Sequence, residues 1–444
     1  MTRGNFLAVL GGFLLLANVA ILRADIVTFA DPGVQASVRL MLKIPQGQPV
    51  TSDAMLGLNA VSLFGVSSLQ GLQYATNLQS LSLETSTPLD LSPLSGLSQI
   101  SDLDMRNSGS ALLNLQPLSG LTSLQNASFT GPISNLAGLG SLKCLTNLSF
   151  AWNGFNDSDL LAVSMLNSLQ YLQIDGGSIQ DIRPVSNITR LYLSNTTWTN
   201  LAQLSGFIKL KSLILQNPAI TDLSSLPALP NLNQIMLDGP IKDLSPLHRL
   251  PQLSSLGLDC TGISDLSQIS SFSNLQELSL GDNGIVDISP LSSLKCLTFL
   301  SLSANSISDL DALRGLNNLD VLDLCDNHVS NIEPISQDHI SGLLGLLSNP
   351  LDANAYNLYI PLLMQNNPTL SIAYDPTPEI STKYLFAIPT LFTAFLNRRF
   401  WKTTLAFWGH HIHLHRPEAT RPEMSTVPPE LFEDFHFANL ILCG

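Results

Sequence analysis

The stretch LQELSLGDNGIVDISPLSSLKCLTFLSLSANSISDLDAL, residues Leu275–Leu313, contains the same pattern twice. Each half begins with LxxLxL, once at Leu275 and again at Leu297. The polar punctuation recurs with it, since Asn283 and Asp287 align with Asn305 and Asp309. A fixed period means that each unit is one structural module whose apolar face is buried only by neighbouring units.

The LxxLxL pattern extends along most of the chain. Its spacing varies in the first units and is nearly constant from Leu193 onward. The last apolar residue of the pattern falls at Leu83, Met105, Phe129, Phe150, Ile174, Leu193, Leu215, Leu237, Leu258, Leu280, Leu302, Leu324 and Leu346. A period of roughly 20–29 residues with LxxLxLxxN at its head identifies a leucine-rich repeat.

The spacing of the leucines predicts the fold. LxL has a period of two, so its leucines share one side of a short strand. Further apolar residues such as Ile285 and Leu291 return from the far side of the coil. We therefore expect an α/β solenoid of about thirteen coils: a right-handed superhelix with a parallel β-sheet on the concave side and short turns or 3₁₀ segments on the convex side.

Two polar positions recur within the coils. An asparagine shortly after the strand can turn its amide inward and satisfy backbone groups left unpaired by the bend. It occurs at Asn153, Asn283, Asn305, Asn327 and Asn349. An aspartate before a short helical turn can cap that turn. It occurs at Asp181, Asp222, Asp243, Asp265, Asp287 and Asp309. Calcium is the alternative, but one acid per coil does not supply six converging oxygens.

The charge composition of the chain limits the classes of partner that it can bind. Charged residues make up only 12% of the chain, and the net charge is −14. Residues 25–375 hold 28 acids and 12 bases, a net charge of −16. Such a body repels nucleic acid and anionic membranes, so a partner steered by charge is basic.

The five cysteines form no CxxC pair, and their number is odd. We expect no structural disulfide, no zinc site and no other metal site. Cys144 and Cys296 share the word SLKCLT, which predicts equivalent, partly buried turn positions.

The pattern also divides the chain. Residues 1–24 contain Arg3 and then an uncharged apolar run from Phe6 to Leu22, which predicts an export signal; an uncleaved membrane anchor is the alternative. Residues 25–66 are expected to form a helical N-terminal cap, in which Asp31-Pro32 starts a helix. The repeat array then occupies 67–350 and a C-terminal cap 351–375.

Residues 376–444 depart from the repeat. Their aromatic and basic composition allows an amphipathic segment that contacts a membrane or a partner. His411, His413 and His415 allow a metal-binding patch. We favour the third alternative, a poorly folded extension, because all periodicity is lost and the end is rich in proline.

A signal, a small helical cap and repeats such as GDNGIVDISPLSSL and SANSISDLDALRGL together resemble the internalin-type leucine-rich repeat proteins of bacteria, over about residues 25–375. The resemblance implies an exported protein, secreted or at the cell surface, whose concave sheet binds another macromolecule. The chain shows no LPxTG-like sorting motif and no clear immunoglobulin-like domain after the array, so surface anchoring and a virulence role do not carry over. Intracellular phosphatase regulators share the short repeat, but the predicted signal argues against them.

The residues between and after the leucines point onto the concave face. There we expect Tyr171, Arg190, Tyr192 and Phe299 to anchor a protein partner, with Asp238 and Asp259 steering it. Tyr171 and Tyr192 fall in successive coils and are expected to form one patch. The sequence contains no GxSxG, HExxH, GxxxxGKS or GxGxxG motif, so we predict a monomeric, non-catalytic binding module without a cofactor. The alternative is a surface-associated structural protein with a solvated concave face and no specific ligand.

Overall fold

The computed structural model describes residues 25–217 and 219–375. Within these ranges one 15-stranded sheet has the order β1-β2-β3-β5-β7-β8-β9-β10-β11-β12-β13-β14-β15-β16-β17. Its strands are β1 (Ala60–Phe64), β2 (Ser80–Thr85), β3 (Asp102–Asn107), β5 (Asn126–Thr130), β7 (Asn147–Ala151), β8 (Tyr171–Asp175), β9 (Arg190–Ser194), β10 (Ser212–Gln216), β11 (Gln234–Asp238), β12 (Ser255–Gly257), β13 (Glu277–Ser279), β14 (Phe299–Ser301), β15 (Val321–Asp323), β16 (Leu343–Gly345) and β17 (Ser371–Ala373).

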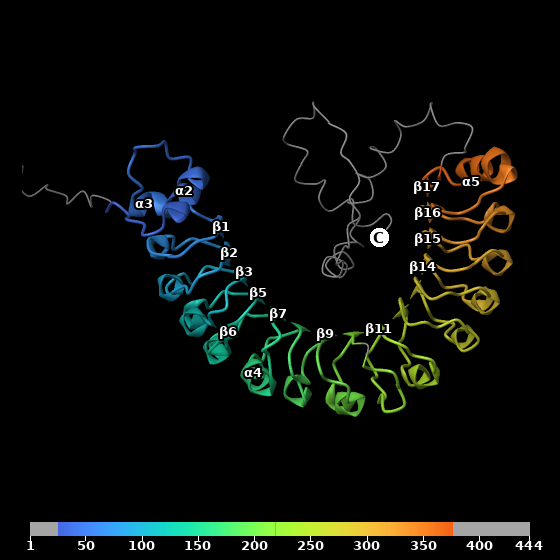
Figure 1. Ribbon diagram of the computed structural model, residues 1–444, viewed down its shortest axis with the longest axis horizontal. Coiled ribbons are helices and arrows are strands. Elements are labelled where there is room, and N and C mark those ends of the chain that lie inside the picture. Colours follow the sequence, from blue (N-terminus) through green and yellow to red (C-terminus); the bar gives the residue numbers. More distant parts are fainter. Residues whose placement is uncertain (1–24, 218, 376–444) are drawn as a thin grey trace, which may run out of the picture. The chain divides into compact units, whose positions relative to one another are not determined.

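The repeat word sets the register of this sheet. The strands from β1 to β16 pair in parallel, each with its neighbour in the order, and leucine meets leucine, as where Leu278 faces Leu300 and Leu300 faces Leu322. In the unit that ends at Leu370, the strands line the inner side of a curve and the short turns line its outer side (Figure 1). The predicted leucine-rich repeat solenoid with a parallel concave sheet is confirmed.

The outer side consists mainly of 3₁₀ segments, as predicted. Eleven of them lie within the described residues, from η1 (Leu72–Tyr74) to η11 (Glu333–Ile335). A second parallel sheet of two strands, β4 (Leu113–Asn114) and β6 (Ile133–Ser134), adds to this side. The sequence did not predict one feature, the α-helix α4 (Asp157–Val163). Asn156 and Asp159 form a capping box at its start, which supplies the partners that a full helical turn needs.

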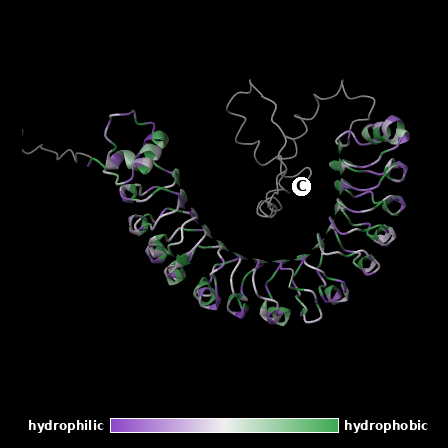
Figure 2. Cartoon of the chain, in the orientation of Figure 1, coloured by the Kyte–Doolittle hydropathy of each residue, from purple (hydrophilic) through white to green (hydrophobic). Residues whose placement is uncertain are grey.

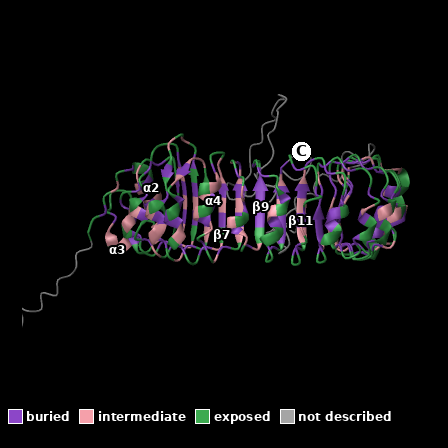
Figure 3. Cartoon of the chain, turned by 90° about the horizontal axis from the view of Figure 1, so that it is seen from below, coloured by how far each residue is buried: buried purple, intermediate pink, exposed green. Residues whose placement is uncertain are grey.

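The leucines of the repeat form one continuous core. They are almost fully buried from Leu63 to Leu346, and hydrophobic residues recur in every coil (Figures 2 and 3). Phe129 stacks on Phe150 of the next coil with ring centroids 5.7 Å apart, and Phe150 lies 5.0 Å from the tilted ring of Phe155 in its own coil. Each coil is therefore stabilised by the one before and the one after it.

The N-terminal end carries two helices, α2 (Pro32–Met41) and α3 (Ser52–Met55). Asp31 caps α2, as its sequence position predicts, by accepting hydrogen bonds from the backbone of Gly33 and Val34 at 2.8 and 3.3 Å. The same carboxylate accepts bonds from the backbone and hydroxyl of Ser67 at 2.7 and 2.9 Å. Burial raises the pKa of Asp31, but the bonds from Ser67 and the α2 backbone outweigh it and leave the pKa lowered.

The other end of the array is also helical. A π-helical turn, η12 (Ala355–Tyr359), leads into α5 (Ile360–Asn366). Within the described residues no helix is long and apolar enough to cross a bilayer. The predicted signal at 1–24 and the tail at 376–444, with its three histidines, lie outside the described residues.

The asparagine ladder is confirmed in the last coils and wrong in one earlier coil. Asn305 donates to the carbonyls of Leu280 and Leu302, both at 2.9 Å, and its oxygen accepts the amide of Ile285 at 2.8 Å. Asn283, Asn327 and Asn349 are buried in the same way. Asn153 is exposed instead, because Phe155 fills the interior of that coil.

Two asparagines one position earlier take the inward role where the sequence did not predict it. Asn107 and Asn217 are each 4% exposed, and both donate to backbone carbonyls of the bend.

The recurring aspartates bind the turns that follow them, as predicted: Asp243, for example, accepts the amide of Ser245 at 2.9 Å. The prediction for Cys144 and Cys296 was wrong, since both are exposed.

Candidate functional site

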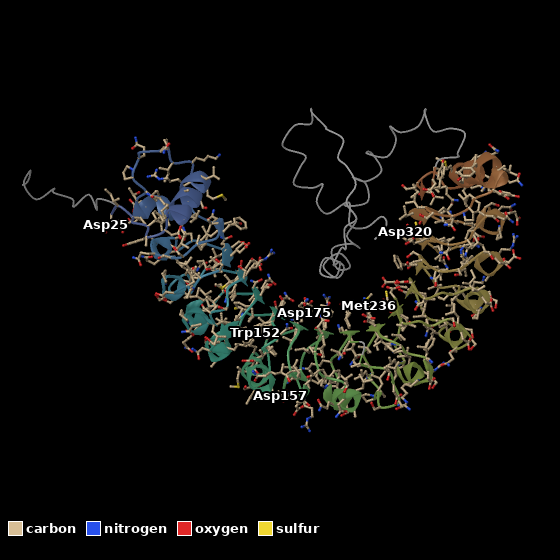
Figure 4. The ribbon with its side chains drawn as sticks, viewed as in Figure 1. Asp25, Trp152, Asp157, Asp175, Met236 and Asp320 are labelled. Carbon is tan, nitrogen blue, oxygen red and sulfur yellow. The ribbon has the colours of Figure 1, made fainter. Side chains whose placement is uncertain are left out.

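The inner face of the sheet carries the candidate residues. Side chains that alternate with the buried leucines form rows across the strands, because parallel pairing places equivalent residues side by side. Asp175 and Met236 lie on this face, whereas Asp157 of α4 lies on the outer side (Figure 4). All six predicted residues belong to the strands or strand ends that form the inner face.

Tyr171 and Arg190 are direct neighbours. They are register partners on β8 and β9, and the positive charge of Arg190 acts on the Tyr171 phenol. The Tyr171 hydroxyl donates to Gln173 Oε1 at 2.7 Å, while Arg190 is exposed. Burial raises the pKa of Tyr171 to about 12, so the phenol stays neutral. We call Tyr171, Gln173, Arg190, Tyr192 and Gln216 the Tyr171 cluster.

Tyr192 lies in this cluster but is not an exposed anchor. Only 5% of it is exposed, and its hydroxyl donates to Gln216 Oε1. Burial raises its pKa; a hydrogen bond with Ser194 opposes this, and the charges of Asp175 and Asp238 add to it. The expected patch of two tyrosines therefore exists, but Tyr192 supports it from below and Tyr171 with Arg190 forms its accessible part.

Asp238 and Asp259 come close to each other at the ends of β11 and β12. Burial raises the pKa of Asp259, hydrogen bonds from Ser279 and Gly281 oppose this, and the charge of Asp238 adds to it. The Asp259 carboxylate accepts the Ser279 hydroxyl at 2.7 Å and the Gly281 amide at 2.6 Å. This carboxylate is held in place by the next coil, and the charge of Asp238 acts on Tyr192 of the Tyr171 cluster.

A shallow groove of about 320 Å³ begins at Tyr171 and extends toward the N-terminal coils. Ser82, Ser128 and Ser149 lie along its floor. On one flank Asn147 donates to Asn126, and Asn126 donates to Asp102, both at 2.6 Å. We call it the serine groove. Because its floor offers small hydroxyls and its flank offers amides, it can bind a polar chain but encloses no small molecule.

Phe299 lies apart from the other five residues. It pairs with Val321 across β14 and β15, and Val321 pairs with Leu343 of β16. All three side chains are half-buried on the inner face. We call them the apolar row. The sequence does carry a signal for Val321 and Leu343. Phe299, Val321 and Leu343 occupy the same position in three successive repeats, and this position is polar in most other coils.

Two further side chains do not add to the candidate site. Trp198 is 1% exposed and donates to Gln203 Oε1 at 3.1 Å, so it belongs to the core. On the outer side His248 Nε2 lies 2.6 Å from the Ser271 hydroxyl. Both lie on exposed turns, and Ser271 also bonds to the Gln268 carbonyl, so local turn contacts account for the pair.

Comparisons with known proteins agree with this architecture. The family model described as leucine-rich repeats (2 copies) matches residues 273–315. No curated protein matches the chain. A leucine-rich repeat protein of Leptospira interrogans has 18% identity and a TM-score of 0.53, over 77% of this chain and 97% of its own.

Two internalins of Listeria monocytogenes are also similar. One, InlF, has 24% identity and a TM-score of 0.41, over 80% of this chain and 93% of its own. The functional domain of the other, InlJ, has 19% identity and a TM-score of 0.46, over 78% of this chain and 74% of its own. The chain is a leucine-rich repeat protein, and internalins are among the proteins to which it is similar.

Proposed function

We propose that this chain is a non-catalytic, exported protein-binding module that recognises its partner with the inner face of the solenoid. The observation that carries the proposal is the Tyr171 cluster beside the serine groove. An exposed guanidinium and a tyrosine whose ring is held by Gln173 form the kind of anchor that dominates protein interfaces. The open groove beside it fits an extended macromolecular surface better than a small substrate.

Charge supports a protein partner rather than a nucleic acid or an anionic membrane. Residues 25–375 carry a net charge of −16, and Asp175 and Asp238 add negative potential beside the cluster. A partner guided to this face is basic, and its association slows as salt is added, because surface charges are screened within about 8 Å at physiological ionic strength.

Export is the second part of the proposal. It rests on the sequence of residues 1–24 and on the resemblance to internalin repeats. Mass spectrometry of the mature protein should find an N-terminus near Asp25. An intact Met1 on a cytoplasmic pool of the protein would instead favour the intracellular phosphatase regulators that share the short repeat.

The binding function is tested by capture on the immobilised full chain, with host-cell extract and extracellular medium as sources. We expect a captured protein whose recovery falls at least tenfold with Tyr171→Ala or Arg190→Ala, the loss expected from a strong anchor. Tyr74→Ala is the matched control, since Tyr74 is 39% exposed on η1, outside the inner face. Equal recovery with all three variants would favour a structural protein without a ligand on this face.

A further inference from the structure

The two halves of the inner face differ in chemistry. The strand positions from β2 to β10 contain four acids, Glu84, Asp102, Asp104 and Asp175, but also two basic residues, Arg106 and Arg190, together with the serine groove. The corresponding positions from β11 to β16 contain no Lys, Arg or His but four acids, Asp238, Asp259, Glu277 and Asp323. The apolar row lies within this acidic half.

The apolar row is flanked by acids on several sides. Glu277 is the register partner of Phe299, so it continues the row toward β13. Asp323 stands two positions after Val321 on the same face, and its carboxylate accepts the Cys325 amide at 3.1 Å. Asp320, directly before Val321, accepts the Ser341 hydroxyl at 2.7 Å and lies at the inner side (Figure 4).

We propose that the apolar row, Phe299, Val321 and Leu343, is the docking site for a basic amphipathic α-helix of a partner protein, which lies across the strands. This inference rests on the proposed function and names the kind of partner segment that the acidic half recognises. Apolar side chains of the helix cover the row, and its lysines or arginines face Glu277, Asp320 and Asp323.

The spacing of the row favours a helix over an extended segment. Neighbouring strands are about 4.8 Å apart, so the three side chains span about 9.6 Å. Helix residues at i, i+4 and i+7 advance by about 10.5 Å, because each residue rises about 1.5 Å. Alternate residues of an extended chain advance by about 13 Å over the same three contacts. The helix therefore matches the row to within about 1 Å, and the extended chain misses it by roughly 3 Å or more.

The test uses the full chain and a fluorescent synthetic peptide of about 18 residues, which is long enough for five turns of an α-helix. Leucines occupy its i, i+4, i+7 and i+11 positions, lysines flank them, and the remaining positions are alanine and glutamine. Two peptides of the same composition serve as comparisons: a scrambled one, and one in which leucine and lysine alternate as in a strand. Fluorescence anisotropy should show that the helical peptide binds at least tenfold more tightly than either.

Substitutions then locate the site. Phe299→Ala and Val321→Thr should each weaken the affinity for the helical peptide by about tenfold or more. Val321→Thr is included because threonine has the shape of valine and disturbs folding least. Ile208→Ala is the matched control, since Ile208 is 61% exposed outside the strands. Ser149→Trp fills the serine groove, and we expect it to leave binding unchanged.

Three results would overturn the docking site. They are equal binding of the helical and scrambled peptides, tighter binding of the alternating peptide, and loss of binding with Ser149→Trp but not with Phe299→Ala. None of them affects the capture experiment with Tyr171→Ala, so failure of this site and failure of the binding function can be told apart.

Discussion

At the scale of single residues, one buried hydroxyl lacks a partner. Thr196 is 6% exposed, and among the described residues its Oγ1 has no hydrogen-bond partner. A buried polar group without a bond costs about 1–3 kcal/mol. We therefore expect Thr196→Val to raise the free energy of unfolding by about 1 kcal/mol in chemical denaturation.

A second threonine provides the control for this prediction. Thr85 is also buried, but its hydroxyl bonds to the carbonyls of Val66 and Thr87 at 3.0 Å. Thr85→Val should therefore lower the free energy of unfolding by about 1–3 kcal/mol. If both variants are destabilised equally, Thr196 has a partner of its own.

The carboxylate of Asp259 makes stability depend on pH. Its pKa is raised in the folded protein by burial and by the charge of Asp238, so its ionisation opposes folding at neutral pH. This penalty disappears as the pH falls through the raised pKa. We expect Asp259→Asn to raise the melting temperature at pH 7, with the gain shrinking toward about pH 4, near the ordinary pKa of a carboxyl group.

Thermal melts of both proteins across this pH range measure the effect. Asp222→Asn is the matched control, because the pKa of exposed Asp222 is lowered by hydrogen bonds from Ser224. Its substitution should not stabilise the protein at pH 7. A gain for Asp259→Asn that stays constant with pH would show that the charge is not the cause.

At the scale of the element, an inward asparagine holds the bend of its coil together. Asn305→Ala removes bonds to the Leu280 and Leu302 carbonyls and to the Ile285 amide, and it leaves these groups buried. We expect a loss of about 3 kcal/mol in the free energy of unfolding. Urea denaturation measures it, and Asn153→Ala, at an exposed site, should change it by no more than about 0.5 kcal/mol.

The bends also show what the sequence could and could not predict. The leucine spacing predicted the parallel sheet and the 3₁₀ turns, because the period of two and the constant repeat length decide which side chains face inward. It did not predict that Asn107 and Asn217 would turn inward and Asn153 outward, because these coils depart from the regular repeat or contain bulky Phe155 and Trp198. There, packing against the neighbouring coil decides the geometry.

The candidate site, like the bends, was predicted only in part from the sequence. The pattern placed Tyr171 and Arg190 on the inner face and predicted that Tyr171 and Tyr192 would meet. It did not predict that Tyr192 would be 5% exposed, because burial on a sheet depends on the side chains of adjacent strands, here Gln173 and Gln216. Glu277 and Val321, the register neighbours of Phe299, occupy the same position of the repeat as Phe299 in the coils before and after it.

At the scale of the whole molecule, stability is local along the array, because each coil contacts only its neighbours. Asp31 ties α2 to the first coil through Ser67. Asp31→Ala should therefore speed hydrogen exchange in β1 while leaving β13 unchanged. Mass spectrometry of exchanged peptides measures both.

The lowered pKa of Asp31 gives this prediction a second test. The stabilisation is present at neutral pH and is lost as the pH falls through the lowered pKa. Protection of β1 in the unmodified chain should fall toward that of the variant under acid conditions. Equal acceleration in β1 and β13 would mean that the array unfolds as one unit.

The matched register of β12 to β16 makes these coils interchangeable in a genetic sense. Unequal recombination between two repeats would insert or delete one whole coil and still leave leucine facing leucine. A coil gained or lost between β10 and β14 would change the separation between the Tyr171 cluster and the apolar row by about 4.8 Å, the distance between strands. The number of repeats in the gene thus sets the distance between the Tyr171 cluster and the apolar row, and a change in this number can adapt that distance to a partner of different size.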